Sequence, residues 1–128
     1  KDEVPRFLNE ADIFLNTTNF DNTPVSVLEA MACGLCVVST NVGGIPYLLT
    51  DEADSLLVRP GDVDACVRAV SRLLTDESLA ARLSAGARRK AESCDWNRVL
   101  PEWQRVLRNV VPSRFSPQPI LSRLTAAL

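Results

Sequence analysis

The sequence predicts an α/β protein built on a parallel sheet. Three short stretches typical of strands, residues 11–16, 36–40 (the buried one) and 55–58, alternate with helical stretches and are joined by short loops. The polar loops 16–23 and 41–46 each follow a strand. Because ligands bind outside the carboxyl ends of the strands in such sheets, both loops are expected on one functional rim.

The helix between the first two strands has clear end signals. Pro24 fits the first helical position, and Thr23 before it fits the N-cap. The helix is expected to run to about Cys33 and to stop at Gly34, because glycine readily adopts the left-handed conformation that ends many helices.

The same helix carries one carboxylate on an otherwise apolar body. Its only clearly polar positions, Ser26 and Glu29, lie three residues apart and so share one face. We expect this helix to be buried, where a lone carboxylate without donors costs several kcal/mol. The free N–H groups of the helix start form an anion site. With Asp21 in the preceding loop, the segment offers phosphate-binding amides beside two carboxylates that can accept hydrogen bonds from hydroxyls.

Three further helices are predicted after the third strand, mainly as scaffold. Asp62 caps the first, whose apolar positions are expected to form one face toward the sheet: Val63, Cys66, Val67, Val70, Leu73 and Leu74. The second covers residues 77–92, and its inward side chains are Leu79, Leu83 and Ala87. Asp95 caps the third, in which Pro101 is expected to produce a kink or a restart.

Composition narrows the function classes. The chain of 128 residues is long enough for one domain with a core. Its formal net charge of −2 gives no general attraction to nucleic acid. The sequence contains no histidine, which excludes histidine ligands and histidine bases, and no apolar run approaches the roughly 20 residues of a membrane span.

The four cysteines are not expected to do chemistry. Cys33 and Cys36 have the CxxC spacing, but they lie at a helix C-terminus, where the helix dipole opposes a thiolate. A zinc site would need a second cysteine pair or histidines. Cys66 falls on the apolar face of a helix. Buried, reduced thiols are therefore predicted.

Two local motifs have plainer interpretations. Residues 51–54 spell Asp-Glu-Ala-Asp, the motif of the DEAD-box RNA helicases, but no phosphate loop of the Gly-x-x-x-x-Gly-Lys-Thr type precedes it. We favour a polar turn before the third strand. Residues 16–18 fit a glycosylation sequon, yet they lie on the predicted rim, and glycosylation is not expected.

The run from Ala11 to about Trp96 resembles the C-terminal, donor-binding domain of the retaining family-four glycosyltransferases of the GT-B fold. The matching pieces follow in the family's order and spacing: residues 11–15, 21–29, 29–34, 37–46 and 56–62. The resemblance implies a parallel-sheet, Rossmann-like half of a GT-B fold with C-terminal helices. That half is incomplete, because the family's domain begins with further strands that this sequence does not contain.

The resemblance also implies roles for individual residues. Glu29 would accept hydrogen bonds from the ribose hydroxyls, and Asp21 would bind a hydroxyl of the donor sugar. Asp21 is one methylene shorter than the family's glutamate, so the loop must set its reach. Cys36 stands where the family usually has proline, and Tyr47 where it often has an acid. The implied donor-binding residues around the two acids are Asn22, Thr23, Pro24, Val25, Ser26, Gly43 and Gly44.

Some of these residues act only through the backbone. Pro24 has no N–H and shapes the turn, whereas Gly43 and Gly44 let their loop approach a ligand closely. The plainer alternative is that Glu29 is an ordinary helix acid with a structural partner and Asp21 an ordinary turn residue.

The implied activity is transfer of a sugar from a nucleoside-diphosphate sugar to an acceptor hydroxyl, with retention of configuration. No cofactor and no metal are expected, because the rim carries no Asp-x-Asp pair. The family binds its acceptor, a glycan or lipid, through an N-terminal domain that is not in this sequence. The resemblance implies polysaccharide or glycoconjugate biosynthesis by a cytoplasmic protein, with peripheral association of the full-length parent at the inner membrane face.

The chain is expected to be a piece of a longer protein, since it begins with Lys1 rather than Met. We predict a partial nucleotide-sugar-binding domain over residues 1–111 and a proline-rich tail with a short apolar segment over 112–128. The fragment alone is expected to be inactive as a transferase and to self-associate.

Two other functions remain open. A sugar-nucleotide epimerase of the GT-B fold would release free sugar without an acceptor, so product analysis separates it from a transferase. A non-catalytic remnant would act only by association and need not bind nucleotide, so a binding titration identifies it.

Overall fold

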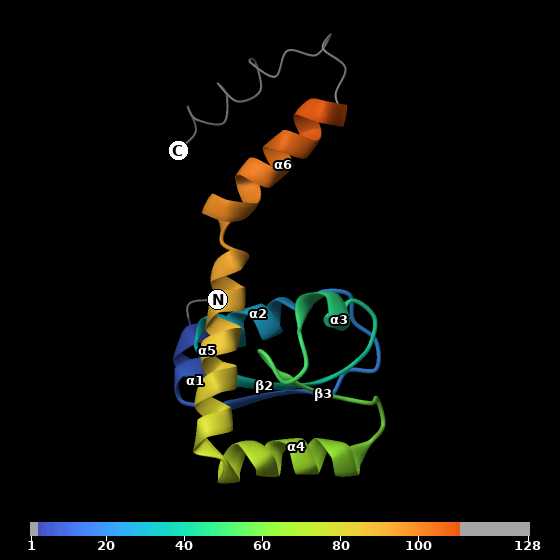
Figure 1. Ribbon diagram of the computed structural model, residues 1–128, viewed down its shortest axis with the longest axis vertical. Coiled ribbons are helices and arrows are strands. Elements are labelled where there is room, and N and C mark those ends of the chain that lie inside the picture. The colour runs from blue at the N-terminus through green and yellow to red at the C-terminus, as the bar shows by residue number, and fades with distance from the viewer. Residues whose placement is uncertain (1–2, 111–128) are drawn as a thin grey trace. The chain divides into compact units, whose positions relative to one another are not determined.

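The computed structural model describes residues 3–110 (Figure 1). These residues divide into two compact units, the first ending at Cys94 and the second beginning at Asp95. The first unit holds the sheet and the helices around it. The second contributes one described helix, α6 (Trp96–Val110). The predicted tail 112–128 lies outside the described residues, so the predicted domain boundary there stays a prediction.

The sheet of the first unit is parallel, as predicted. Its three strands are β1 (Ile13–Asn16), β2 (Cys36–Thr40) and β3 (Leu56–Val58), in the order β1-β2-β3. Ile13 pairs with Cys36, and Val38 pairs with Leu56. The bounds of β2 agree with the prediction, whereas β1 and β3 begin later than expected. The α/β fold class is confirmed.

Helices cover both faces of the sheet (Figure 1). The predicted ones are α2 (Val25–Ala32), α4 (Val63–Thr75) and α5 (Glu77–Ser93). Two short helices were not predicted, α1 (Val4–Asn9) and α3 (Ile45–Leu48). Helices α2 and α3 lie on one side of the sheet and α4 on the other, while α5 passes the end of the sheet where β2 begins (Figure 1). Along residues 3–110, none of the helices has the length and apolar character needed to cross a bilayer.

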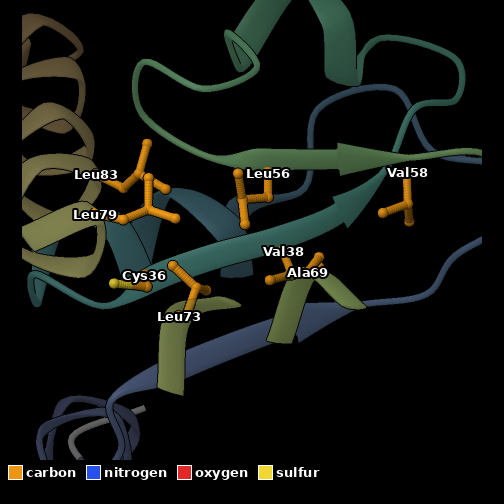
Figure 2. Close-up of a cluster of buried hydrophobic side chains, with 8 residues drawn as sticks. All are labelled: Cys36, Val38, Leu56, Val58, Ala69, Leu73, Leu79 and Leu83. Carbon is orange, nitrogen blue, oxygen red and sulfur yellow. The ribbon is translucent and has the colours of Figure 1, made fainter. Parts of the chain in front are cut away.

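The core has one part on each face of the sheet. Strand β2 is buried throughout, so its alternating side chains enter both parts. Figure 2 shows the part under α4, where Cys36 and Val38 meet the helical residues Leu73 and Leu79. The other part joins the opposite face of β2 to α2 and α3 through Val27, Met31, Val37, Ile45, Leu48, Leu49 and Ala87.

Helix α4 packs differently from the prediction. Its N-cap is confirmed, because the side chain of Asp62 accepts a hydrogen bond from the amide of Ala65 at 2.8 Å. The buried residues are Leu73, as predicted, and Ala69, while the predicted Cys66 and Val70 are partly buried against the core. Three of the six predicted contact residues are exposed: Val63 at 71%, Val67 at 58% and Leu74 at 72%. Since a helix turns roughly 100° per residue, they point well away from the stripe through Ala69 that faces the sheet.

Helix α5 is tied to the end of α2. The hydroxyl of Ser84 donates to the carbonyl oxygen of Gly34, and the guanidinium of Arg88 donates to that of Ala32. These donors satisfy carbonyl groups that a helix end leaves without partners. Gly34 has φ +82°, which confirms the predicted stop.

Helix α6, described by itself, continues through Pro101. The restart that was expected as one alternative at this proline is therefore wrong, and the other alternative, a kink, stays a prediction. A proline removes one backbone donor but does not by itself end a helix that other interactions maintain.

Candidate functional site

The candidate site lies where two loops leave the carboxyl edge of the sheet. One runs from the end of β1 to the start of α2, and the other from the end of β2 to α3 (Figure 1). The predicted site residues are on these loops and on α2. Strand order therefore brings together segments that are about twenty residues apart in the sequence, in keeping with the general position of sites in parallel sheets.

The start of α2 differs in one detail from the prediction. Pro24, not Thr23, is the N-cap, because its backbone is extended (φ −68°, ψ 114°) and its carbonyl oxygen accepts from the amide of Val27 at 3.1 Å. No side chain caps the helix start within the described chain. Pro24 is buried, whereas Val25 and Ser26 are exposed. The first-turn amides of α2 therefore lack a side-chain acceptor.

Glu29 is exposed, which corrects the expectation of a buried helix. Helix α2 buries Val27, Ala30 and Met31 on one side only. The opposite side, which includes Glu29, faces solvent, and water can solvate the carboxylate. Within residues 3–110, no hydrogen bond or ion pair of Glu29's side chain is present, so the structural partner of the plainer alternative is not found there.

The loop that carries Asp21 contacts the glycine loop directly. The amide of Gly44 donates to the carbonyl oxygen of Asp21 at 2.9 Å. A Cβ atom on Gly43 would lie 1.9 Å from that oxygen, and one on Gly44 would lie 1.6 Å from the carbonyl oxygen of Asn22. Only glycine fits at either position. The glycines thus allow a close approach between two protein loops, and their approach to a ligand stays a prediction.

Sequence reasoning missed a set of polar contacts beneath the Asp21 loop. The Nδ2 of Asn16 donates to the hydroxyl of Ser39 at 3.1 Å, and the hydroxyl of Thr40 donates to the carbonyl oxygen of Thr18 at 2.5 Å. The signal was available, because two hydroxyl residues end an otherwise apolar strand. This contact engages the side-chain amide of Asn16, while the expectation that its sequon is not used stays a prediction.

A hollow of about 540 Å³ opens on the α4 side of the same rim. Its walls include Leu15, Val58, Val63 and Val67, with Arg59 at the border. Neither Asp21 nor Glu29 lines it. Apolar walls suit hydrocarbon side chains better than a hydrated diphosphate. We therefore place the candidate ligand site at the start of α2 and not in this hollow.

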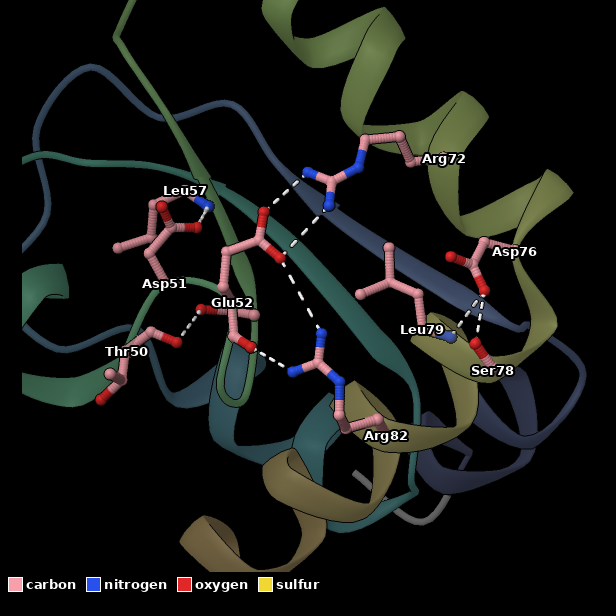
Figure 3. A network of polar contacts seen from close by, with 10 residues as sticks. Thr50, Asp51, Glu52, Leu57, Arg72, Asp76, Ser78, Leu79 and Arg82 are labelled. Atoms are coloured by element: carbon pink, nitrogen blue, oxygen red, sulfur yellow. Dashed lines mark hydrogen bonds and ion pairs between the residues drawn. The ribbon is translucent and has the colours of Figure 1, made fainter.

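Residues 51–54 form a polar turn, as we favoured over a helicase motif. The carboxylate of Asp51 accepts from the amide of Leu57, and that of Asp54 accepts from the amide of Thr50, both at 2.8 Å. Figure 3 shows Glu52 held by the guanidinium groups of Arg72 and Arg82. All three acids are therefore engaged in holding the turn.

The cysteines are free thiols in the described chain. Burial raises the pKa of the Cys36 thiol, which keeps it protonated. Cys33 and Cys66 are half-buried, but Cys94 is exposed, so the prediction of buried thiols is wrong for that residue. No cluster of three or more candidate metal ligands occurs among residues 3–110.

Comparison with known proteins points to one family. A family model described as glycosyl transferases group 1 matches residues 1–76. The D-inositol 3-phosphate glycosyltransferase of Salinispora arenicola is 35% identical over 99 residues, which cover 77% of this chain and 22% of that protein. The chain spans about a fifth of the length of the curated relatives it matches.

Solved structures show the same fold. Sucrose-phosphate synthase from Thermosynechococcus elongatus superposes with a TM-score of 0.74 at 26% identity, covering 81% of this chain and 26% of that one. HepE of Anabaena, solved in complex with UDP, gives a TM-score of 0.78 at 21% identity, covering 86% of this chain and 31% of that one. These neighbours are GT-B glycosyltransferases, so the sheet and helices of this chain correspond to part of a GT-B fold.

Proposed function

Because this chain belongs to the group 1 glycosyltransferases, we propose that it binds a nucleoside-diphosphate sugar for retaining transfer to an acceptor hydroxyl. One observation carries the proposal. Uncapped amides at the start of α2 lie between Asp21, in the loop before the helix, and Glu29, on its exposed side. This arrangement offers one group for each part of such a donor.

The diphosphate is assigned to the amides of Val25 and Ser26. First-turn amides have no partner within their own helix, and the helix dipole adds positive potential there. Anions bind at helix starts for both reasons. As the bond to the sugar breaks, negative charge grows on the leaving diphosphate. Donors that are already in place stabilise that charge without reorganisation.

The two carboxylates are assigned to hydroxyl groups of the donor. Glu29 shares an exposed face of α2 with Ser26, and its oxygens accept hydrogen bonds from ribose hydroxyls in this proposal. Asp21 accepts from a hydroxyl of the sugar. Its backbone is fixed by Gly44, while no hydrogen bond within residues 3–110 occupies its carboxylate. A shorter acid on a fixed loop can reach only a narrow range of positions, which favours selectivity among sugars.

The remaining parts of the reaction are assigned outside residues 1–128. We propose that no divalent metal acts here, and that basic groups from elsewhere in the protein share the diphosphate charge. A relative from Campylobacter jejuni is named for transfer to a diphospho-undecaprenol acceptor. A glycan or lipid acceptor of this kind is proposed for the protein that contains this chain.

The test compares UDP and UDP-glucose as probes, by nuclear magnetic resonance titration of the 128-residue chain. Asp21→Ala is expected to leave the affinity for UDP within about 2-fold of the original. It should remove most of the additional affinity for UDP-glucose, because one charged hydrogen bond is worth about 1.5–3 kcal/mol. An equal loss for both probes would show that Asp21 does not recognise the sugar.

A further inference from the structure

The loop that carries Asp21 is tied to the end of β2 at successive points. Ser39 accepts from Asn16, Thr40 donates to the carbonyl oxygen of Thr18, and Gly44 donates to that of Asp21. We call these three contacts the loop clamp. They run in order along both segments, so they fix the path of the loop and not only one end of it.

Thr40 is the central member of the loop clamp. Thr40 is 5% exposed, and its hydroxyl donates at 2.5 Å to the carbonyl oxygen of Thr18, which lies in the loop after β1. Ser39, next to it, is fully buried and also donates to the carbonyl oxygen of Thr40 at 3.2 Å. Removal of the Thr40 hydroxyl would leave the carbonyl oxygen of Thr18 without this hydrogen-bond donor.

The loop clamp leaves the chemistry of the loop free. It uses the backbone carbonyl groups of Thr18 and Asp21 and leaves the carboxylate of Asp21 available. None of its three hydrogen bonds involves the first-turn amides of α2 or Glu29. A change in the clamp should therefore move Asp21 without altering the groups assigned to the diphosphate and the ribose.

We propose that Thr40 is a positioning residue, which sets the place of Asp21 relative to the start of α2 and thereby the recognition of the donor sugar. The clamp itself follows from the contacts above, whereas its use in sugar recognition rests on the function proposed in the preceding section. The residue acts through Thr18 and the loop backbone and does not itself touch substrate.

The first measurement is amide hydrogen exchange at Gly44 in the chain without ligand. Thr40→Val keeps the shape of the side chain but removes its hydroxyl. If the contacts act together, exchange at Gly44 should rise roughly 3- to 10-fold, the factor expected for one neutral hydrogen bond. In Thr40→Ser, which keeps the hydroxyl, the exchange rate at Gly44 should stay close to that of the original chain. Unchanged exchange at Gly44 in folded Thr40→Val would overturn the clamp.

The second measurement is the ratio of affinities for UDP-glucose and UDP. Thr40→Val should lower this ratio about 3-fold or more, a factor in the range of one neutral hydrogen bond, and leave the affinity for UDP unchanged, as is expected of Asp21→Ala. Thr75→Val removes a similar hydroxyl-to-carbonyl contact at the end of α4. It should change neither the affinity ratio nor the affinity for UDP. A normal ratio in Thr40→Val would overturn the positioning role. If the original chain bound neither probe, the proposed function would fail, while the exchange measurement would still decide the clamp.

Discussion

The carboxylate of Glu52 accepts two hydrogen bonds from the guanidinium of Arg72, at 2.7 and 3.2 Å (Figure 3). Glu52 has φ +60°, a left-handed conformation that is uncommon outside glycine. Arg82 donates to the carbonyl oxygen of the same residue. The turn before β3 is thus fastened to α4 and α5 through a single acid.

The ion pair between Glu52 and Arg72 should make the stability of the folded protein depend on pH. The hydrogen bond from Arg72 holds the pKa of Glu52 below its ordinary value. A lowered folded-state pKa stabilises the protein above the unfolded pKa, and the effect is lost as the pH falls through the folded value. Glu52→Gln should therefore lower the melting temperature slightly at pH 7, as exposed pairs contribute little, and this difference should vanish as the pH falls through the folded-state pKa of Glu52.

A double-mutant cycle tests the same pair. If the ion pair is the cause, Glu52→Gln should have a smaller effect in an Arg72→Gln background, where only the longer contact between Glu52 and Arg82 remains. Thermal unfolding of the four proteins at pH 7 and at low pH measures this. Equal losses from Glu52→Gln in both backgrounds would assign the effect to the turn conformation instead.

Alanine substitution at Gly44 and at Gly61 should lower the free energy of unfolding for different reasons and by different amounts. Gly44 has φ −86°, so alanine there suffers no conformational strain, but its Cβ meets backbone atoms of Asn22. Gly61 has φ +78° and open space around it, so alanine there suffers only strain. Gly61→Ala should lower the free energy of unfolding by about 1 kcal/mol. Gly44→Ala should lower it by about 2–3 kcal/mol.

Chemical shifts distinguish the two mechanisms. Gly44→Ala should move the amide resonances of Asn22 and its neighbours, because the Asp21 loop must withdraw to make room. Gly61→Ala should leave them in place. If Gly44→Ala were as stable as the original and left these resonances unchanged, the close contact between the loops would be wrong.

These examples show what the sequence could and could not predict. Strand β2 was predictable because an apolar run of strand length follows a glycine stop. The inward face of α4 was predicted only in part, because its valines have helical spacing, whereas the structure buries Ala69 and leaves Val63 and Val67 exposed. The hydroxyl residues at the end of β2 were visible in the sequence, but the partner of Thr40 was not, since it depends on the path of the loop after β1.

The assignment of Glu29 predicts a specific loss of nucleotide affinity. Glu29→Gln should weaken UDP binding by about 1–3 kcal/mol, the value of a charged hydrogen-bond partner. Glu77→Gln, an acid at the start of α5, serves as the matched control and should bind as the original does. Unchanged UDP affinity in folded Glu29→Gln, measured by resonance titration, would remove the ribose assignment.

The exposed edge of β1 predicts self-association of the 128-residue chain. Within residues 3–110, β1 pairs only with β2, and Leu15 on it is 48% exposed. Unpaired edges with apolar side chains invite pairing between chains. Sedimentation velocity should show association that grows with concentration, and Leu15→Lys should reduce it. Tyr47→Lys, at an exposed position off the sheet edge, should not reduce association. Equal association in all three proteins would exclude the β1 edge as the contact between chains.

The most direct test of the central claim maps where a nucleotide sugar binds. Amide resonances of the labelled chain are followed during titration with UDP-glucose, and with ADP-glucose and GDP-glucose in parallel, since the base is not specified. At least one donor should shift the amides of Asn22, Val25, Ser26 and Glu29, and leave those of Val63 and Val67 beside the apolar hollow in place. Shifts confined to the hollow, or none with any donor at millimolar concentration, would contradict a donor site at the start of α2.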